Sequence, residues 1–520
     1  MNRFSARVLL LIFPSLWGYP AWAQSSAPRV EVTKARNAGS AARVAPIARQ
    51  QLFGNIPVST RSQEARKLVE LSLDKYENHI VDGALDNARR AVKKDPQFAL
   101  AYAALSLASL GGIPDSAALG RAKALLPHAT PDEQLLIRWM TSISDRDRLP
   151  AITAMNDLLK RYPNNKHVLY ILADWLYSQQ DYDRSREILE TVRRLDPDFP
   201  PALNLLGYAY IQTGTPDPEK AIASLQRYAE VLPNSPNPQD SLGEVLRFSG
   251  DDQGSLEHYS AALKIDPAYI SSHYGLGDTS ALMGNYPLAR AEYDDAIAVA
   301  NNPRDRSHCE FQKALVYFWE GQPAEGRKVL DALSEKARQQ KEPYSQFEIA
   351  FGRAMLSADP SVELEQLRWL ETWLQDPIDG LSEVDRDTFL AQVLRERARI
   401  SSRRGEFALA EATIRKLERL AERSRDLLVA NSYESARGYL LAAKDDLAGA
   451  VDELAADPRS LLALDQLAAA QEKLGNASAA EATRTRIKYL RAPNVEWYLL
   501  TTTSTARRRN SRRFGILWST

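Results

Sequence analysis

Few residues of this 520-residue chain have types and spacing that could do chemistry. His308 stands directly before Cys309, and an imidazole beside a thiol could bind a metal or activate a nucleophile. Cys309 is the only cysteine, so the chain cannot supply a second thiolate for a zinc site. The pair also lies at the start of a predicted helix. We therefore predict that both residues are structural.

Sequence motifs of common enzymes are missing. The chain contains no G-x-x-x-x-G-K-[ST], no H-E-x-x-H and no G-x-S-x-G. The nearest glycine-rich phrase, Gly275-Leu276-Gly277, lacks a third glycine and lies within a predicted helix. Trp369 and Trp373, four residues apart, could form an exposed aromatic platform, but such a pair more often packs against the next helix, which we expect here. The sequence predicts no enzyme activity, no cofactor and no metal site.

The composition is that of a folded protein whose charges are segregated along the chain. Hydrophobic residues make up 44% and charged residues 26%, which is too apolar for a chain that is disordered throughout. The net charge is −1, but residues 1–61 carry +7 and residues 507–520 carry +5, so residues 62–506 carry −13. Binding phosphates requires a basic surface. The acidic body therefore argues against nucleic acid as its partner.

The N-terminus has the pattern of a secretory signal peptide. Two arginines precede an apolar run from Val8 to Trp17, and Ala21-Trp22-Ala23 is a small-residue cleavage pattern. A membrane anchor would need about 20 apolar residues, and this run is shorter and contains Pro14. We predict a signal peptide over residues 1–23 with cleavage after Ala23, export to the periplasm or the extracellular space, and a flexible leader over residues 24–59.

A period of 34 to 36 residues runs through the chain. It is marked by prolines, which close helices because proline lacks the amide donor; they stand at Pro163, Pro197, Pro233 and Pro267. The phrases RLDP and KIDP end at two of them. Each period contains two amphipathic segments, such as ALNLLGYAYIQT and EKAIASLQRYAEVL, whose apolar residues recur three and four apart. The sequence therefore predicts stacked helical hairpins.

The period that begins near residue 200 resembles the tetratricopeptide repeat. It supplies the signature residues Leu203, Leu206, Gly207, Tyr210, Ala221, Leu225 and Pro233. It departs from the family at Tyr228, where the signature has alanine, and it carries two extra residues in the TGTPDP turn. A small residue at Gly207 facing Ala221 would let the two helices approach closely. We therefore predict that the conspicuous residues of this period are structural.

The resemblance implies an all-α fold, a right-handed superhelical α-solenoid of stacked helix-turn-helix repeats. We predict a regular array at 60–301, irregular hairpins at 302–425 with inserts at 302–312 and 341–386, C-terminal repeats with a capping helix at 426–491, and a basic tail at 492–520. Thr60 and Thr130 are expected to cap helices. Pro458 comes early in its repeat, which predicts a short helix before it, and EWYLLTTTST in the tail has the composition of a β-strand.

The resemblance also implies where a ligand would bind. In this family the first helix of each hairpin lines the concave side, and ligand contacts fall at positions 2, 5, 9 and 12 of a repeat. These positions hold His167, Tyr170, Asp174, Tyr177, Asn204, Tyr208, Asp240, Glu244, Arg247, Tyr274 and Asp278. Most are aromatic or acidic, whereas family members that clamp C-terminal carboxylates use Lys and Arg there. The groove predicts a basic peptide ligand, unless these are merely solvated polar residues.

Together these patterns predict a non-catalytic exported scaffold that binds a partner protein or an extended peptide along a concave acidic and aromatic groove. It would bind no nucleic acid and would not be an integral membrane protein. The alternative is a structural subunit of an envelope secretion or polysaccharide-export assembly, held by its convex face and its basic ends. The basic leader or tail of the chain could itself occupy the groove, because both are opposite in charge to the body.

Overall fold

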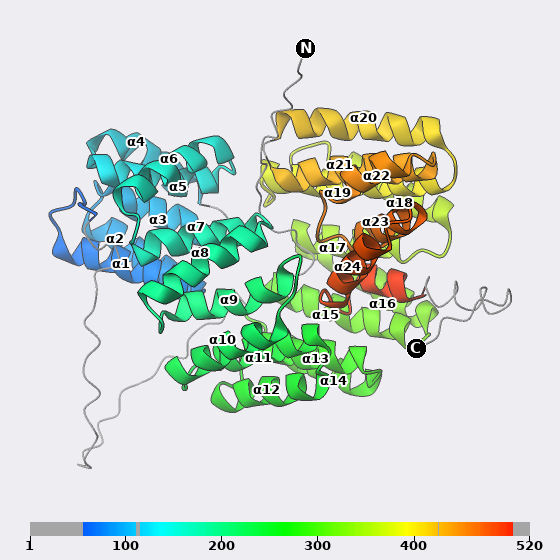
Figure 1. Ribbon diagram of the computed structural model, residues 1–520, viewed down its shortest axis with the longest axis horizontal. Helices are drawn as coiled ribbons and strands as arrows, with labels where there is room; N and C mark the ends of the chain where they lie inside the picture. Colours follow the sequence, from blue (N-terminus) through cyan, green and yellow to red (C-terminus); the bar gives the residue numbers. More distant parts are fainter. Residues whose placement is uncertain (1–55, 111–114, 425, 503–520) are drawn as a thin grey trace. The chain divides into compact units, whose positions relative to one another are not determined.

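The computed structural model describes residues 56–110, 115–424 and 426–502, and the regular structure of these ranges is helical (Figure 1). The described chain divides into two compact units, residues 56–171 and residues 172–502, with the division inside helix α7. The predicted signal peptide, its cleavage site and the leader up to residue 55 lie outside the described residues.

The helices follow one another with short connections. Residues 56–171 contain α1 (Gln63–Glu77), α2 (Val81–Lys94), α3 (Ala99–Ser109), α4 (Ser116–Leu125), the 3-10 helix η1 (Leu126–His128), α5 (Pro131–Ser144), α6 (Arg148–Arg161) and the start of α7 (Lys166–Ser178). The second unit continues with α8 (Tyr182–Leu195), α9 (Pro200–Gln212), α10 (Pro218–Val231), α11 (Pro236–Ser249), α12 (Asp252–Ile265), α13 (Ile270–Leu282), α14 (Tyr286–Val299), α15 (Pro303–Trp319), α16 (Pro323–Gln340), α17 (Pro343–Met355), α18 (Pro360–Trp373), α19 (Glu383–Arg403), α20 (Phe407–Arg423), α21 (Leu427–Ala443), α22 (Leu447–Leu454), α23 (Leu461–Lys473) and α24 (Ala477–Lys488), and residues 495–502 are also helical.

Consecutive helices pack in pairs, which confirms the predicted all-α solenoid. The signature glycines explain the close packing. A Cβ atom at Gly207 of α9 would lie 2.5 Å from the Cγ atom of Leu225 on α10, and one at Gly277 would lie 2.7 Å from the ring of Tyr293. The nearest atoms to Gly207 thus belong to Leu225, one turn beyond the predicted Ala221. A large side chain of the second helix, rather than a small one, covers the glycine.

One helix cap matches the prediction and one does not. Thr130 accepts from the backbone amide of Glu133 (3.2 Å) and donates its own amide to the Glu133 carboxylate (3.3 Å), as a capping box requires. Helix α1 is capped by Ser62, whose hydroxyl accepts from the amide of Ala65 (3.1 Å). The Thr60 hydroxyl is engaged elsewhere, since it donates to Asp95 (2.5 Å). The choice of Thr60 as the cap was therefore wrong by two residues.

The region from residue 302 onward is more regular than expected. Helix α15 begins at Pro303, where the Asn302 side chain accepts from the amide of Asp305, so the predicted insert at 302–312 is helical. Most of the predicted insert at 341–386 is occupied by α17 and α18. The short helix before Pro458 is confirmed, because α22 has eight residues. Residues 495–502 form a helix rather than the β-strand that their composition favoured.

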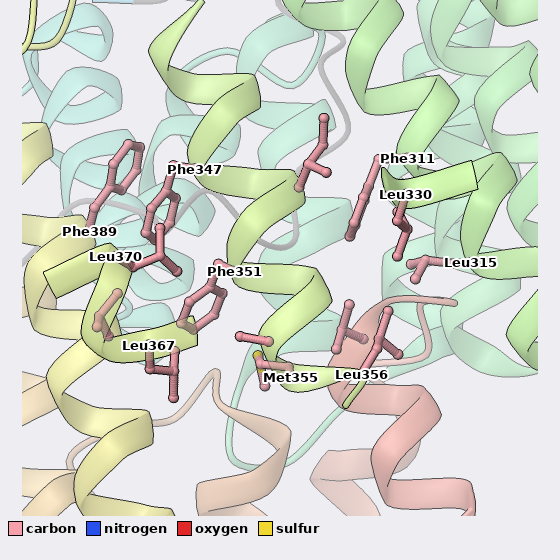
Figure 2. Packing of buried hydrophobic residues seen from close by; sticks show 14 of the residues in the cluster. Phe311, Leu315, Leu330, Phe347, Phe351, Met355, Leu356, Leu367, Leu370 and Phe389 are labelled. Atoms are coloured by element: carbon pink, nitrogen blue, oxygen red, sulfur yellow. The ribbon is translucent and has the colours of Figure 1, made fainter. Parts of the chain in front are cut away.

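A hydrophobic core joins α15 to α19, and Figure 2 shows part of it. The rings of Phe347 and Phe389 lie parallel with centroids 3.9 Å apart, and Phe311 fills the space left by Gly352. Val495, from the C-terminal helical segment, is 1% exposed and belongs to the same core. Burial of its apolar face fixes residues 495–502 against the array, which explains why a sequence of strand-like composition is helical.

Candidate protein-binding site

The residues predicted to line a groove lie on α7, α9, α11 and α13. His167 and Tyr170 belong to the unit of residues 56–171, and the other nine belong to residues 172–502. Of these nine, Asp174 and Tyr274 are half-buried, and seven are at most 5% exposed: Tyr177, Asn204, Tyr208, Asp240, Glu244, Arg247 and Asp278. The burial of these seven side chains differs from the alternative that the positions hold merely solvated polar residues.

In the first unit, His167 and Tyr170 contact Glu77 at the end of α1. The Nδ1 atom of His167 lies 2.9 Å and 3.1 Å from the two carboxylate oxygens, and the Tyr170 hydroxyl donates to the Glu77 carbonyl (3.1 Å). Burial raises the pKa of the Glu77 carboxyl, although His167 opposes the shift. An apolar cavity of about 30 Å³, lined in part by Leu73 and Met140, adjoins Glu77 and His167. Both predicted residues thus join α7 to α1.

In the second unit, Arg247 is the centre of a buried polar network on α9, α11 and α13. Its guanidinium lies 3.3 Å from Glu244 and 3.2 Å from Asp278. The Tyr208 hydroxyl donates to Glu244 (3.0 Å), and the Tyr293 hydroxyl donates to Asp278 (2.7 Å). We call the surface formed by Tyr208, Asp240, Glu244, Arg247 and Asp278 the first-helix face.

Carboxyl groups outnumber guanidinium groups on the first-helix face. Three carboxyl groups, those of Asp240, Glu244 and Asp278, surround the single guanidinium of Arg247. Burial is the largest cause that raises the pKa of each, and the pKa of Asp240 rises to about 8 even though Ser272 donates a hydrogen bond to it at 2.6 Å. Burial thus favours the neutral form of these carboxyl groups, and a positive charge nearby would favour their ionised form.

Arg491, which follows α24, contacts Asp252 and the main chain of Arg247. The Arg491 guanidinium contacts both carboxylate oxygens of Asp252 (2.9 and 3.1 Å) at the start of α12 and donates to the carbonyl of Arg247 (3.3 Å). In return, Arg247 donates from Nη1 to the carbonyl of Arg491 (3.0 Å). The two arginines are thus joined through each other's main chain, and an extended stretch of the chain is held at the end of α11.

The residues that follow continue this docking, and we call residues 491–502 the C-terminal segment. Glu496 accepts from the amide of Leu461 (2.7 Å) and lies 3.4 Å from Arg395. The Tyr498 ring meets Phe318 and Trp319 edge to face, with centroids 5.9 Å and 5.4 Å apart. Part of the predicted basic tail is therefore a docked element of the second unit.

A small polar cavity lies beside the C-terminal segment. Its volume is about 60 Å³, and its lining includes Gln392, Arg395, Asn431 and Glu496. A space of this size and polarity has room for a few hydrogen-bonded water molecules. The lining charges pair with one another, since Arg395 lies 3.1 Å from Asp457.

His308 and Cys309, the residue pair that could do chemistry, are both held within the helical packing. Cys309 is 2% exposed and burial raises the pKa of its thiol well above the usual range, so a reactive thiolate is disfavoured, in agreement with a structural role. Its neighbour His308 contacts Glu348 (2.5 Å) and the Tyr274 hydroxyl (3.0 Å). Through these contacts His308, on α15, joins α13 to α17.

The expected packing of the two tryptophans is only half realised. Trp373 packs against the core of α15–α19, but Trp369 is 59% exposed. Their rings lie parallel with centroids 6.1 Å apart. The prediction that both would pack against the next helix is therefore wrong for Trp369, whose ring is turned outward to solvent.

Sequence patterns did not reveal the contacts of the C-terminal segment. Arg491 and Asp252 are 239 positions apart, and no periodicity links them. The available signal was electrostatic, because a basic end and an acidic body attract each other. Among the described residues, no helix combines the length and the apolar character that crossing a membrane requires.

Comparison with known proteins agrees with the repeat architecture. Family models described as "Tetratricopeptide repeat" and "TPR repeat" match residues 150–207, 176–243 and 243–284. The TPR repeat-containing protein YpiA of Bacillus subtilis (strain 168) is 24% identical over 149 residues, which are 28% of this chain and 35% of that protein. The chain thus spans about a third of the length of this relative.

Two solved structures align with parts of the chain. A crystal structure of MamA protein is 21% identical and covers 34% of this chain and 93% of its own, with a TM-score of 0.28. The crystal structure of PilW, a widely conserved type IV pilus biogenesis factor, is 14% identical and covers 40% of this chain and 93% of its own, with a TM-score of 0.35. Proteins with these repeats are generally non-catalytic scaffolds for protein interaction. Residues 150–284 of this chain therefore contain tetratricopeptide repeats, and helical hairpins continue on both sides of them among the described residues.

Proposed function

We propose that this protein is a non-catalytic exported scaffold that binds an extended basic segment of a partner protein on the first-helix face. The observation that carries the proposal is the docking of the C-terminal segment, because it indicates what this face accepts. Arg247 donates to a main-chain carbonyl, an acceptor that every peptide offers, and Arg491 brings a guanidinium to Asp252. A partner segment would take the place of residues 491–502.

The charge of the acidic body supports a basic partner. Residues 62–506 carry −13, so the surrounding field attracts cations. Half-buried Tyr274 on α13 would extend the contact area. His167 and Tyr170 are engaged with Glu77 in the other unit, and we assign them a structural role.

Loosening the C-terminal segment should expose the face. In Arg491→Glu, the new carboxylate would repel Asp252, so the segment should compete less well with added peptide. We expect basic peptides to bind this variant about tenfold more tightly than the parent chain, which corresponds to about 1.4 kcal/mol. Fluorescence anisotropy with basic, acidic and apolar peptide pools measures the effect. The gain should be confined to the basic pool and should shrink at high salt.

Arg484→Glu is the matched control. Arg484 is a half-buried arginine of α24 that pairs with Glu472, away from α11 and α12. The Arg484→Glu variant should leave peptide affinity unchanged. Equal affinity for all three pools, or the same gain in both variants, would contradict the proposed site. That result would favour the alternative of a structural subunit of an envelope assembly, in which other surfaces make the contacts.

Export is the second part of the proposal. It rests on the apolar run and the Ala21-Trp22-Ala23 pattern of the sequence. The mature protein recovered outside the cytoplasm should begin at Gln24, and N-terminal sequencing checks this. A secreted chain that still began with Met1 would show that the segment is not cleaved.

A further inference from the structure

Three side chains with metal-binding atoms meet between α13 and α14, outside the first-helix face. His273 lies on α13, and Glu292 and Asp295 lie three residues apart on α14. One ligand atom from each residue lies within 4.8 Å of the other two. His273 and Glu292 are half-buried and Asp295 is exposed, so solutes can reach the cluster from the Asp295 side.

Hydrogen bonding fixes which nitrogen of His273 faces the carboxylates. The Nε2 atom lies 3.0 Å from the carbonyl oxygen of Pro267. A carbonyl oxygen can only accept, so Nε2 must carry a proton and donate it. In the neutral ring, Nδ1 then presents a lone pair, and it lies 3.5 Å from a carboxylate oxygen of Glu292.

This arrangement places a lone pair against negative charge. Neither Nδ1 of the neutral ring nor the carboxylates of Glu292 and Asp295 can donate a hydrogen bond. The contact is repulsive until a positive charge enters, either as a proton on Nδ1 or as a metal ion. Both carboxylates attract a positive charge to this position.

We propose that His273, Glu292 and Asp295 bind a divalent transition-metal ion such as Zn²⁺. An imidazole nitrogen with two carboxylate oxygens is a ligand set suited to zinc, with bonds of about 2.0–2.2 Å and a remaining position for water. The Pro267 carbonyl plays the part of the outer partner that holds a ligating histidine in the correct tautomer. Magnesium and calcium prefer oxygen ligands alone, so they should bind more weakly.

Closing the site requires a small movement. Ligand atoms around a tetrahedral zinc ion lie about 3.3–3.5 Å apart, which follows from the bond lengths. The cluster must therefore contract by roughly an ångström from its 4.8 Å limit. Asp295 is exposed and can change its rotamer at low cost. Bound metal would join the two helices of one hairpin and stabilise them.

The test is a metal titration of the full-length chain. Zn²⁺ should raise the melting temperature, because a ligand that binds the folded state stabilises it in proportion to its occupancy. Co²⁺ should give visible absorption bands on binding, which provides a readout that does not depend on stability. His273→Ala should weaken Co²⁺ binding by about 100-fold, and Glu292→Gln and Asp295→Asn by about tenfold or more. Mg²⁺ should have little effect.

His258→Ala is the matched control. His258 is a half-buried histidine of the adjacent helix α12 whose Nδ1 contacts the amide oxygen of Gln239 at 2.7 Å. Its replacement should leave the Co²⁺ spectrum and the Zn²⁺ stabilisation unchanged. If His273→Ala retains the parent spectrum, or if the parent gives neither the spectrum nor the stabilisation, only a proton occupies the site and the proposal is overturned.

Discussion

Replacing Arg247 with methionine should lower the free energy of unfolding by about 3–5 kcal/mol. The side chain of Arg247 is 2% exposed and lies 3.3 Å from Glu244 and 3.2 Å from Asp278. Methionine removes the only guanidinium of the first-helix face and leaves both carboxyl groups buried without it. Breaking one side of a buried ion pair is costly for this reason. Urea denaturation followed by circular dichroism measures the loss.

Two variants sharpen this prediction. The triple variant Arg247→Met, Glu244→Gln, Asp278→Asn should recover much of the loss, because removing both sides of a buried pair leaves no unpaired charge. Arg227→Met on α10 removes an exposed arginine that pairs with Asp198 and Glu230, and it should leave the unfolding curve essentially unchanged. A small effect of Arg247→Met would mean that water reaches the network and that the face is open.

Asp240→Asn should stabilise the protein, and increasingly so as the pH rises. Burial first, and then the neighbouring charge of Glu244, raise the pKa of the Asp240 carboxyl to about 8, against 3.8 in its ordinary state. The folded state therefore keeps a proton that the unfolded state releases. This contribution to stability is complete below pH 3.8 and is lost as the pH rises through about 8.

The asparagine side chain has no proton to lose, so the Asp240→Asn variant should escape this decline. The difference in unfolding free energy between the variant and the parent should grow by up to about 1.4 kcal/mol per pH unit between about pH 4 and pH 8 and then level off. Denaturation curves across this range measure it. Asp294→Asn, at an exposed residue paired with Lys313, should show no such growth. A pH-independent difference for Asp240→Asn would show that its carboxyl is ionised in the folded protein at neutral pH.

The repeats could be predicted from the sequence because their physics is local. Proline positions, glycine at Gly207 and the three-and-four spacing of apolar residues act within about 34 residues, and the structure repeats them hairpin by hairpin. Competition between neighbouring side chains explains the wrong choice of helix cap for α1. Two hydroxyl residues compete to cap α1, and Ser62 prevails because Thr60 is drawn to Asp95.

The burial of the first-helix face could not be predicted in the same way. The family positions fall on the first helices, but burial depends on what covers them, and Arg491 reaches Asp252 from 239 positions away. The helix at residues 495–502 likewise depends on the core that receives Val495 and Tyr498. The cluster around His273 was missed because its three residues come from two helices and match no spaced motif.

Hydrogen exchange of the full-length chain, with and without a saturating basic peptide, tests the central claim most directly. Amides that become more protected report where the peptide binds, and amides that become less protected report what it displaces. We expect increased protection in α9, α11 and α13 together with faster exchange in residues 495–502. Protection elsewhere, or an unchanged C-terminal segment at full peptide occupancy, would contradict binding at the first-helix face.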